Sequence, residues 1–202
     1  MRAGGLEWSS EDATRCVFMK RRPNRVRQSG FLLMEVLITM VILLIGLLGL
    51  AGLQARAMQS ENESYQRVQA LILLRDIADR INANRAQAAN YIALTTAPLG
   101  TGSSKDCSAP TTVADIDLCA WDAALKGAAE TSGGNSVGAM IGARGCVTST
   151  AADQYLLEVV WQGLVRTANP PNTVLCGLDL YGDETQRRAV TSIVQIGDLV
   201  AP

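Results

Sequence analysis

Histidine is absent from this chain of 202 residues, and aromatic residues make up only 4% of it. Without histidine the chain cannot carry a Ser-His-Asp triad, a Cys-His pair, an HExxH zinc site or any imidazole acid–base step. The scarcity of aromatic residues disfavours a surface on which the bases of a single strand stack. Charged residues make up 18%, and the net charge of −1 offers no basic surface to nucleic acid. The sequence therefore predicts neither an enzyme nor a direct nucleic-acid partner, and it predicts no cofactor.

Apolar residues, by contrast, reach 48% and gather in one run, Phe31–Leu53, which contains a single ionisable residue, Glu35. As a helix these 23 residues span about 35 Å, enough to cross a bilayer core of about 30 Å. Residues 1–30 carry seven basic and three acidic side chains, a charge of +4, which leaves −5 for residues 31–202. The positive-inside rule then keeps the leader in the cytoplasm and exports the rest.

A secretory signal peptide is the competing interpretation of this N-terminus. It has a shorter apolar core of about 7–15 residues and a small-residue cleavage site, whereas a helical pattern follows this run. The start of translation is also open. From Met19 the chain reads as a compact basic leader, and the 18 residues before it show no periodicity. We therefore consider Met19 as the alternative start.

The junction GFLLME at residues 30–35, followed by the unbroken apolar run, resembles the processing site of type IV prepilins. The resemblance implies that prepilin peptidase cuts between Gly30 and Phe31, that Phe31 is methylated, and that the apolar segment is retained. Glu35 is expensive in lipid, at about 2.5–3.5 kcal/mol. The resemblance assigns it a partner, the amine of Phe31 on an adjacent subunit. The alternative is a solvated Glu35 near the membrane surface. Leu33 and Met34 depart conservatively from the commonest family residues.

Four later stretches resemble the minor pilins of the PilV type and narrow the family. The resemblance implies an inner-membrane protein with one membrane span and a periplasmic C-terminal domain, which then enters an extracellular pilus. It implies prepilin peptidase, other minor pilins, the major pilin, a tip adhesin and membrane lipid as partners. A minor pseudopilin of type II secretion, or a binding domain on an uncleaved anchor, are the alternative functions. The four stretches are Arg75–Tyr91, Leu118–Leu125, Trp161–Ala168 and Leu180–Ile196.

The helical pattern continues beyond the membrane run. Apolar residues recur every three to five positions to about Leu94, with charges between them, which predicts one long helix. Its halves are 31–53 in the membrane and 54–94 with one apolar stripe. Gly46, Gly49 and Gly52 favour either close helix packing or unwinding on assembly, and the sequence does not choose between them. The stripe consists of Met58, Tyr65, Val68, Ile72, Ile77, Ile81, Ala88 and Ile92.

Residues 95–202 read as a globular head with a small antiparallel sheet. Thr95–Thr112 is rich in Gly, Ser, Thr and Pro, and Thr131–Gly145 is rich in glycine but lacks a phosphate-binding GKS or GKT ending, so both predict loops. A short helix is expected at about Ala114–Glu130. Alternation and turn residues predict three or four short strands, with one sheet face packed on the long helix in an α+β, pilin-like fold. The strands that can be placed are Tyr155–Trp161, Val174–Leu178 and Ala189–Ile196.

Four of the five cysteines remain once residues 1–30, with Cys16, are removed. An even number in an exported domain suggests disulfides. Three pairings can be drawn, and we favour one that joins the loop to the short helix and another that ties two sheet segments. Zinc is the weaker alternative, because no pair has CxxC spacing and no histidine can help. The favoured pairs are Cys107–Cys119 and Cys146–Cys176.

Two groups of acidic residues are candidates for a metal or catalytic site. Asp179, Asp183 and Glu184 could bind calcium, although a solvated turn explains them more simply. A second group, formed by Asp115, Asp117 and Asp122, is most simply the polar face of the short helix. The sequence therefore predicts no metal site.

Overall fold

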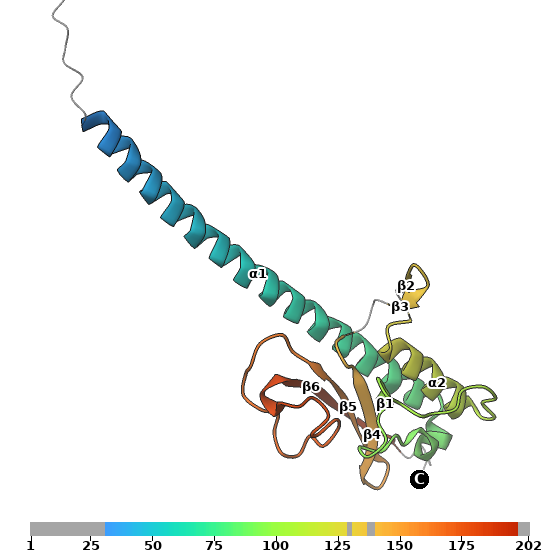
Figure 1. Ribbon diagram of the computed structural model, residues 1–202. Coiled ribbons are helices and arrows are strands. Elements are labelled where there is room, and N and C mark those ends of the chain that lie inside the picture. Colours follow the sequence, from blue (N-terminus) through green and yellow to red (C-terminus); the bar gives the residue numbers. More distant parts are fainter. Residues whose placement is uncertain (1–30, 129–130, 137–139, 198–202) are drawn as a thin grey trace, which may run out of the picture. The chain divides into compact units, whose positions relative to one another are not determined.

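The computed structural model describes residues 31–128, 131–136 and 140–197, and the chain divides into two compact units between Gly49 and Leu50. The predicted leader, with Gly30 and the alternative start at Met19, lies outside the described residues. The first unit is therefore described through residues 31–49, and the second contains all strands found in the described residues (Figure 1).

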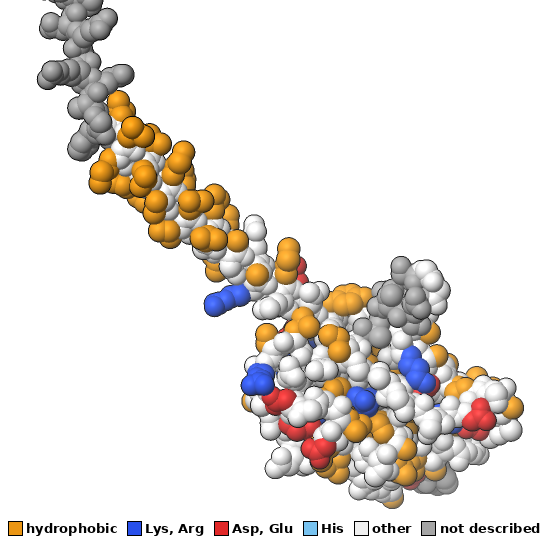
Figure 2. All heavy atoms as spheres, viewed as in Figure 1, with side chains coloured by type: hydrophobic (Ala, Val, Ile, Leu, Met, Phe, Trp, Pro, Cys, Tyr) orange, Lys and Arg blue, Asp and Glu red, His pale blue; other side chains and the backbone are white. Residues whose placement is uncertain are grey.

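The first element is helix α1 (Phe31–Ala83), whose apolar and proline-free N-terminal sequence favours a continuous helix. All described side chains from residue 32 to residue 62 are exposed, and hydrophobic side chains cover the N-terminal part of α1 (Figure 2). By length and composition this helix can cross a membrane. Its three glycines lie within regular helix, and a Cβ atom at each would meet nothing within 4 Å.

The predicted extension of this helix to Leu94 is wrong. After α1 ends at Ala83, Asn84 has φ −116° and ψ 41°, and a 3₁₀ helix, η1 (Arg85–Tyr91), follows. The amide of Asn84 donates to the Tyr91 hydroxyl at 3.2 Å. Because the Tyr91 side chain is fully buried, the break in the helix allows this residue to enter the core.

Helix α2 (Val113–Leu125) lies where a short helix was predicted, but it ends earlier than expected. The side chain of Thr112 caps its N-terminus by accepting a hydrogen bond from the Asp115 N–H group at 3.1 Å. Its C-terminus is followed by Gly127, whose φ of +82° is the left-handed conformation that commonly terminates helices.

The main sheet has the order β1-β4-β5-β6, and all its neighbouring strands are antiparallel. A separate hairpin joins β2 (Thr131–Ser132) to β3 (Asn135–Ser136). Two of the predicted strands are confirmed as β5 and β6. The four strands of the sheet are β1 (Leu99–Gly100), β4 (Arg144–Ala151), β5 (Gln154–Gln162) and β6 (Arg187–Gln195).

Three local predictions are wrong. Residues 174–178 form turns rather than a strand, the expected loop 131–145 contains the hairpin and the start of β4, and the expected loop 95–112 contains β1. The strand β4 escaped prediction because its residues, RGCVTSTA, are small and do not alternate between apolar and polar. It is a strand because both of its edges pair, one with β5 and the other with β1 and Ala93.

The core lies between one face of the sheet and the two helices. The part of α1 that enters it presents Ala70, Leu74, Ile77 and Ile81, spaced at helical intervals, and α2 adds Trp121. The predicted stripe is thus only partly right. Within it Ile77, Ile81 and Ala88 are buried, whereas five members are exposed. Four of the five lie on α1, which packs on the sheet through another face, and the fifth, Ile92, follows η1. The exposed members are Met58, Tyr65, Val68, Ile72 and Ile92.

The opposite face of the sheet is also covered. A second buried cluster joins β4 and β5 to the segment between β5 and β6. Side chains alternate along β5, so that Val159 faces the helices and Val160 faces this segment. The second cluster consists of Cys146, Val160, Val174, Cys176 and Tyr181.

Candidate functional site

The predicted processing site is represented by its C-terminal side. Gly30 lies outside the described residues, and Phe31 is the first residue of α1. Glu35 lies on the exposed surface of α1, where it lines a shallow hollow of about 250 Å³ with Met34, Ile38 and Thr39. Within residues 31–128, 131–136 and 140–197, no cation pairs with Glu35. The Glu35 carboxylate, on an apolar part of the α1 surface, is therefore accessible to a cation from another molecule.

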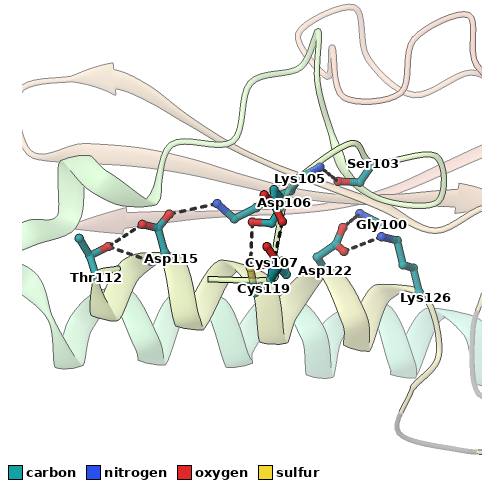
Figure 3. The surroundings of a disulfide bond; sticks show 11 residues. Gly100, Ser103, Lys105, Asp106, Cys107, Thr112, Asp115, Cys119, Asp122 and Lys126 are labelled. Atoms are coloured by element: carbon teal, nitrogen blue, oxygen red, sulfur yellow. Dashed lines mark hydrogen bonds and ion pairs between the residues drawn. A yellow bond between two sulfur atoms is a disulfide. The ribbon is translucent and has the colours of Figure 1, made fainter. Parts of the chain in front are cut away.

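The disulfide between Cys107 and Cys119 ties the loop after β1 to α2, with Cα atoms 5.7 Å apart (Figure 3). Polar contacts hold the same loop on both sides of this bond. Lys105 forms an ion pair with Asp115 at 3.1 Å and lowers the pKa of that carboxyl. The buried Asp122 accepts the Gly100 N–H group at 2.7 Å and pairs with Lys126 at 2.6 Å. These contacts fix the loop before α2.

Asp117, the middle member of the predicted acidic helix face, instead joins three elements. It accepts a hydrogen bond from the Tyr91 hydroxyl at 2.5 Å and pairs with Arg80 of α1 at 2.8 Å. Arg80 also pairs with Asp76 at 2.9 Å. Burial and the bond to Asp117 raise the pKa of Tyr91. The cluster therefore fixes η1 and α2 against the C-terminal part of α1.

The second disulfide joins Cys146 of β4 to Cys176, with Cα atoms 5.8 Å apart. Both sulfurs are buried, as is Glu158, which stands opposite Cys146 in the antiparallel pair of β4 and β5. Burial raises the pKa of Glu158, although the N–H groups of Cys176 and Leu175 and the charge of Arg187 act in the other direction. This disulfide fastens the covering segment to the sheet.

Arg187 holds the same segment from its other side. Its guanidinium donates to the carbonyl groups of Val174 and Cys176 at 2.9 and 3.1 Å and pairs with Glu184 at 2.5 Å. The carbonyls of this turn are thus satisfied by a side chain in place of a neighbouring strand. This explains why an apolar stretch that resembles a strand does not form one.

The three residues of the candidate calcium site, Asp179, Asp183 and Glu184, each have their own partners. The Asp179 N–H group donates to Glu184 at 2.9 Å, and Glu184 is paired with Arg187. Asp183 caps the short 3₁₀ helix η2 (Glu184–Gln186) by accepting from the Thr185 N–H group, and it pairs with Arg166 at 3.0 Å. These contacts stabilise the turn before β6.

Two acidic residues, Glu63 and Glu158, make tertiary contacts that the sequence analysis did not predict. Glu63 of α1 accepts the N–H groups of Leu164 and Val165 and pairs with Arg188 at 3.3 Å. Nothing in a helical pattern distinguishes such a carboxylate from a solvated one. Glu158 gave a weak signal, because it is the one charge within the apolar run YLLEVVW of β5.

Comparison with models of protein families matches residues 52–124 to the Tt1218-like family, described as type IV pilin Tt1218. The matched stretch includes the C-terminal part of α1, η1, β1 and α2. Comparisons with curated proteins and with solved structures gave no match. The family match supports a type IV pilin, and the long apolar helix with a small antiparallel sheet is the α+β fold expected of one. The matched family consists of structural subunits, which agrees with the expectation that the chain is not an enzyme.

Proposed function

We propose that this chain is a minor pilin of the PilV type, which takes part in the initiation, assembly or modification of a type IV pilus. The match of residues 52–124 to a type IV pilin family carries the proposal. The GFLLME junction and the four PilV-like stretches support it from the sequence.

The proposed maturation begins with cleavage between Gly30 and Phe31 by prepilin peptidase, followed by methylation of the new amine of Phe31. A glycine before the bond allows the backbone to enter a protease cleft in an extended form without a side chain in the way. The retained segment 31–53 would then anchor the subunit in the inner membrane until it enters the filament. Residues 95–202, with both disulfides, would form the periplasmic head.

Glu35 is the proposed docking residue. Its carboxylate lies beside Met34, Ile38 and Thr39 on the exposed surface of α1. Once that surface enters lipid or a filament, the charge needs a partner of opposite sign. The amine of Phe31 on an adjacent subunit supplies that charge. A charge-assisted hydrogen bond contributes about 1.5–3 kcal/mol, which corresponds to about a 10–100-fold change in the docking equilibrium.

The other proposed partners follow from assembly: the major pilin, other minor pilins and a tip adhesin. The proposal needs no cofactor and no nucleic acid.

Mass spectrometry of filaments sheared from cells tests the proposal. We expect the peptide Phe31–Arg56 with one N-terminal methyl group. If methylated Phe31 occurs in membranes and never in filaments, the result contradicts membership of the filament and favours a type II secretion pseudopilin or a priming subunit of very low abundance. An intact Gly30–Phe31 bond in every fraction would instead identify an uncleaved anchor.

The docking residue has its own test. We expect Glu35→Gln to leave cleavage and methylation intact and to reduce the amount of this subunit in filaments by about 10–100-fold. The matched control is Thr39→Val, one helical turn away on the same hollow, which removes a hydroxyl bonded within its own helix and should leave incorporation unchanged. Normal incorporation of the Glu35→Gln subunit would contradict the docking role.

A further inference from the structure

Three groups that can bind metals converge on the face of the sheet away from the helices. The Sγ atoms of Cys146 and Cys176 and a carboxylate oxygen of Glu158 all lie within 4.8 Å of one another. Cys146 and Glu158 are directly opposite each other in the β4–β5 register, so their side chains leave the same face of the sheet. The turn that contains Cys176 closes over them. The three exposed fractions are 0%, 0% and 1%.

A second observation concerns the same carboxylate. The Oε1 atom of Glu158 is buried and has no hydrogen-bond partner among the described residues, although the N–H groups of Cys176 and Leu175 interact with this carboxylate. A buried acceptor without a partner costs about 1–3 kcal/mol, and such atoms in native proteins call for an explanation. While Cys146 and Cys176 are joined in the disulfide, their sulfurs are not thiolates and cannot bind a metal ion together with Glu158.

We propose that reduction of the Cys146–Cys176 disulfide creates a binding site for one thiophilic divalent cation of the Zn²⁺ class, with Cys146, Cys176 and Glu158 as its protein ligands. A dithiol supplies the two electrons. It forms its own cyclic disulfide, and the protein S–S bond is converted to two thiols. Binding of the cation then displaces the two thiol protons to solvent, and the carboxylate completes a set of three ligands with total charge −3.

The local geometry suits such an ion. Zinc binds thiolate sulfur at about 2.3 Å and carboxylate oxygen at about 2.0–2.2 Å, so ligand atoms around it lie about 3.3–3.8 Å apart. The released sulfurs would separate to about that distance, within a group that already spans no more than 4.8 Å. Catalytic and exchangeable zinc sites commonly have three protein ligands and a water. The Arg187 guanidinium, bonded to the Cys176 carbonyl and paired with Glu184, lies beside this group and acts to lower the pKa of Glu158.

The other disulfide provides an internal control. Cys107 and Cys119 also become thiols on reduction, but among the described residues they form no comparable group with a carboxylate. Cys107 is exposed, whereas both cysteines of the proposed site are buried. A metal that simply binds free thiols would not distinguish the two pairs.

The test is a Co²⁺ titration of the full chain in detergent, after reduction with dithiothreitol and anaerobic removal of the reductant. We expect thiolate-to-cobalt absorption that saturates at one Co²⁺ per chain, persists in Cys107→Ser/Cys119→Ser and is lost in Cys146→Ser/Cys176→Ser. Glu158→Gln should weaken binding at least about 10-fold, as removal of a site partner commonly does. The oxidised wild-type chain, which is folded and keeps only Cys16 outside the two disulfides, should show no absorption that saturates at one Co²⁺ per chain.

Loss of the absorption in Cys107→Ser/Cys119→Ser, or its retention in Cys146→Ser/Cys176→Ser, would overturn the proposal. So would a reduced wild-type chain that gives no signal. Unchanged affinity in Glu158→Gln would remove the carboxylate from the ligand set and likewise refute the site as proposed. For this variant, circular dichroism in the oxidised state checks that the fold is retained.

Discussion

Replacement of Arg187 by methionine tests how the turn at residues 174–176 is held without a strand partner. The side chain of Arg187 is 2% exposed and donates to the carbonyls of Val174 and Cys176. Methionine would leave both carbonyls without that donor, at about 1–3 kcal/mol each. Burial of its apolar side chain would return about 1–2 kcal/mol. Glu184 is partly exposed and can be hydrated. We expect Arg187→Met to lower the free energy of unfolding by about 3 kcal/mol.

Urea unfolding of the full chain in detergent, followed by the fluorescence of the buried Trp121 and Trp161, measures this loss. The matched control is Arg166→Met. Arg166 is also paired with an acidic residue, but its side chain is 77% exposed, so its replacement should cost less than about 0.5 kcal/mol. The explanation is refuted if Arg187→Met changes stability by less than about 1 kcal/mol, or if Arg166→Met costs as much.

Two further substitutions test the packing around α2. Gly145→Ala would place a Cβ atom 2.3 Å from a ring carbon of Trp121 and should lower the free energy of unfolding by about 1–3 kcal/mol. Gly197→Ala, whose Cβ atom would meet nothing within 4 Å, should be nearly neutral. Equal urea midpoints for the two variants would contradict this packing. Thr112→Ala removes the cap on the Asp115 N–H group and should cost about 1 kcal/mol in the same assay, and an unchanged urea midpoint would contradict the capping role.

The elements that could be predicted from the sequence are those with a strong period. Every second residue of β5 from Tyr155 to Trp161 is apolar, and β6 places Val190 and Val194 on one face in the same way. The apolar and proline-free start of α1 favours a continuous helix. The fold class follows from them, because a small antiparallel sheet with one apolar face must pack on the long helix.

The elements that were missed depend on contacts distant in sequence. Strand β4 is recognisable only through its paired neighbours. The end of α1 depends on the burial of Tyr91 and its bond to Asp117, 26 residues later. The turn around Cys176 depends on Glu158 and Arg187, which come from two different strands. In each case the local sequence is compatible with several structures and the tertiary partner selects one.

The candidate site divides in the same way. The cysteine positions could be paired from sequence, since one pair lies near a predicted loop and helix and the other near predicted sheet segments. The surroundings of those pairs could not. In the alternating pattern of β5, Glu158 falls on the face opposite Leu157 and Val159, and it does lie there. That face is buried by the segment after β5, however, so a residue that looks solvated in the pattern stands beside a disulfide.

The exposed apolar surface bears on the choice between the proposed functions. Residues 32–53 have no buried side chain, as a segment in lipid or in a filament core requires. Beyond them Val68, Leu71 and Ile72 are also exposed, beside Thr191 and Ser192 of β6, in a groove of about 440 Å³. A free-standing periplasmic domain has no need for this second apolar strip, and contiguous apolar surface on soluble proteins commonly marks an interaction site. The strip therefore favours an assembling subunit over an anchored binding domain.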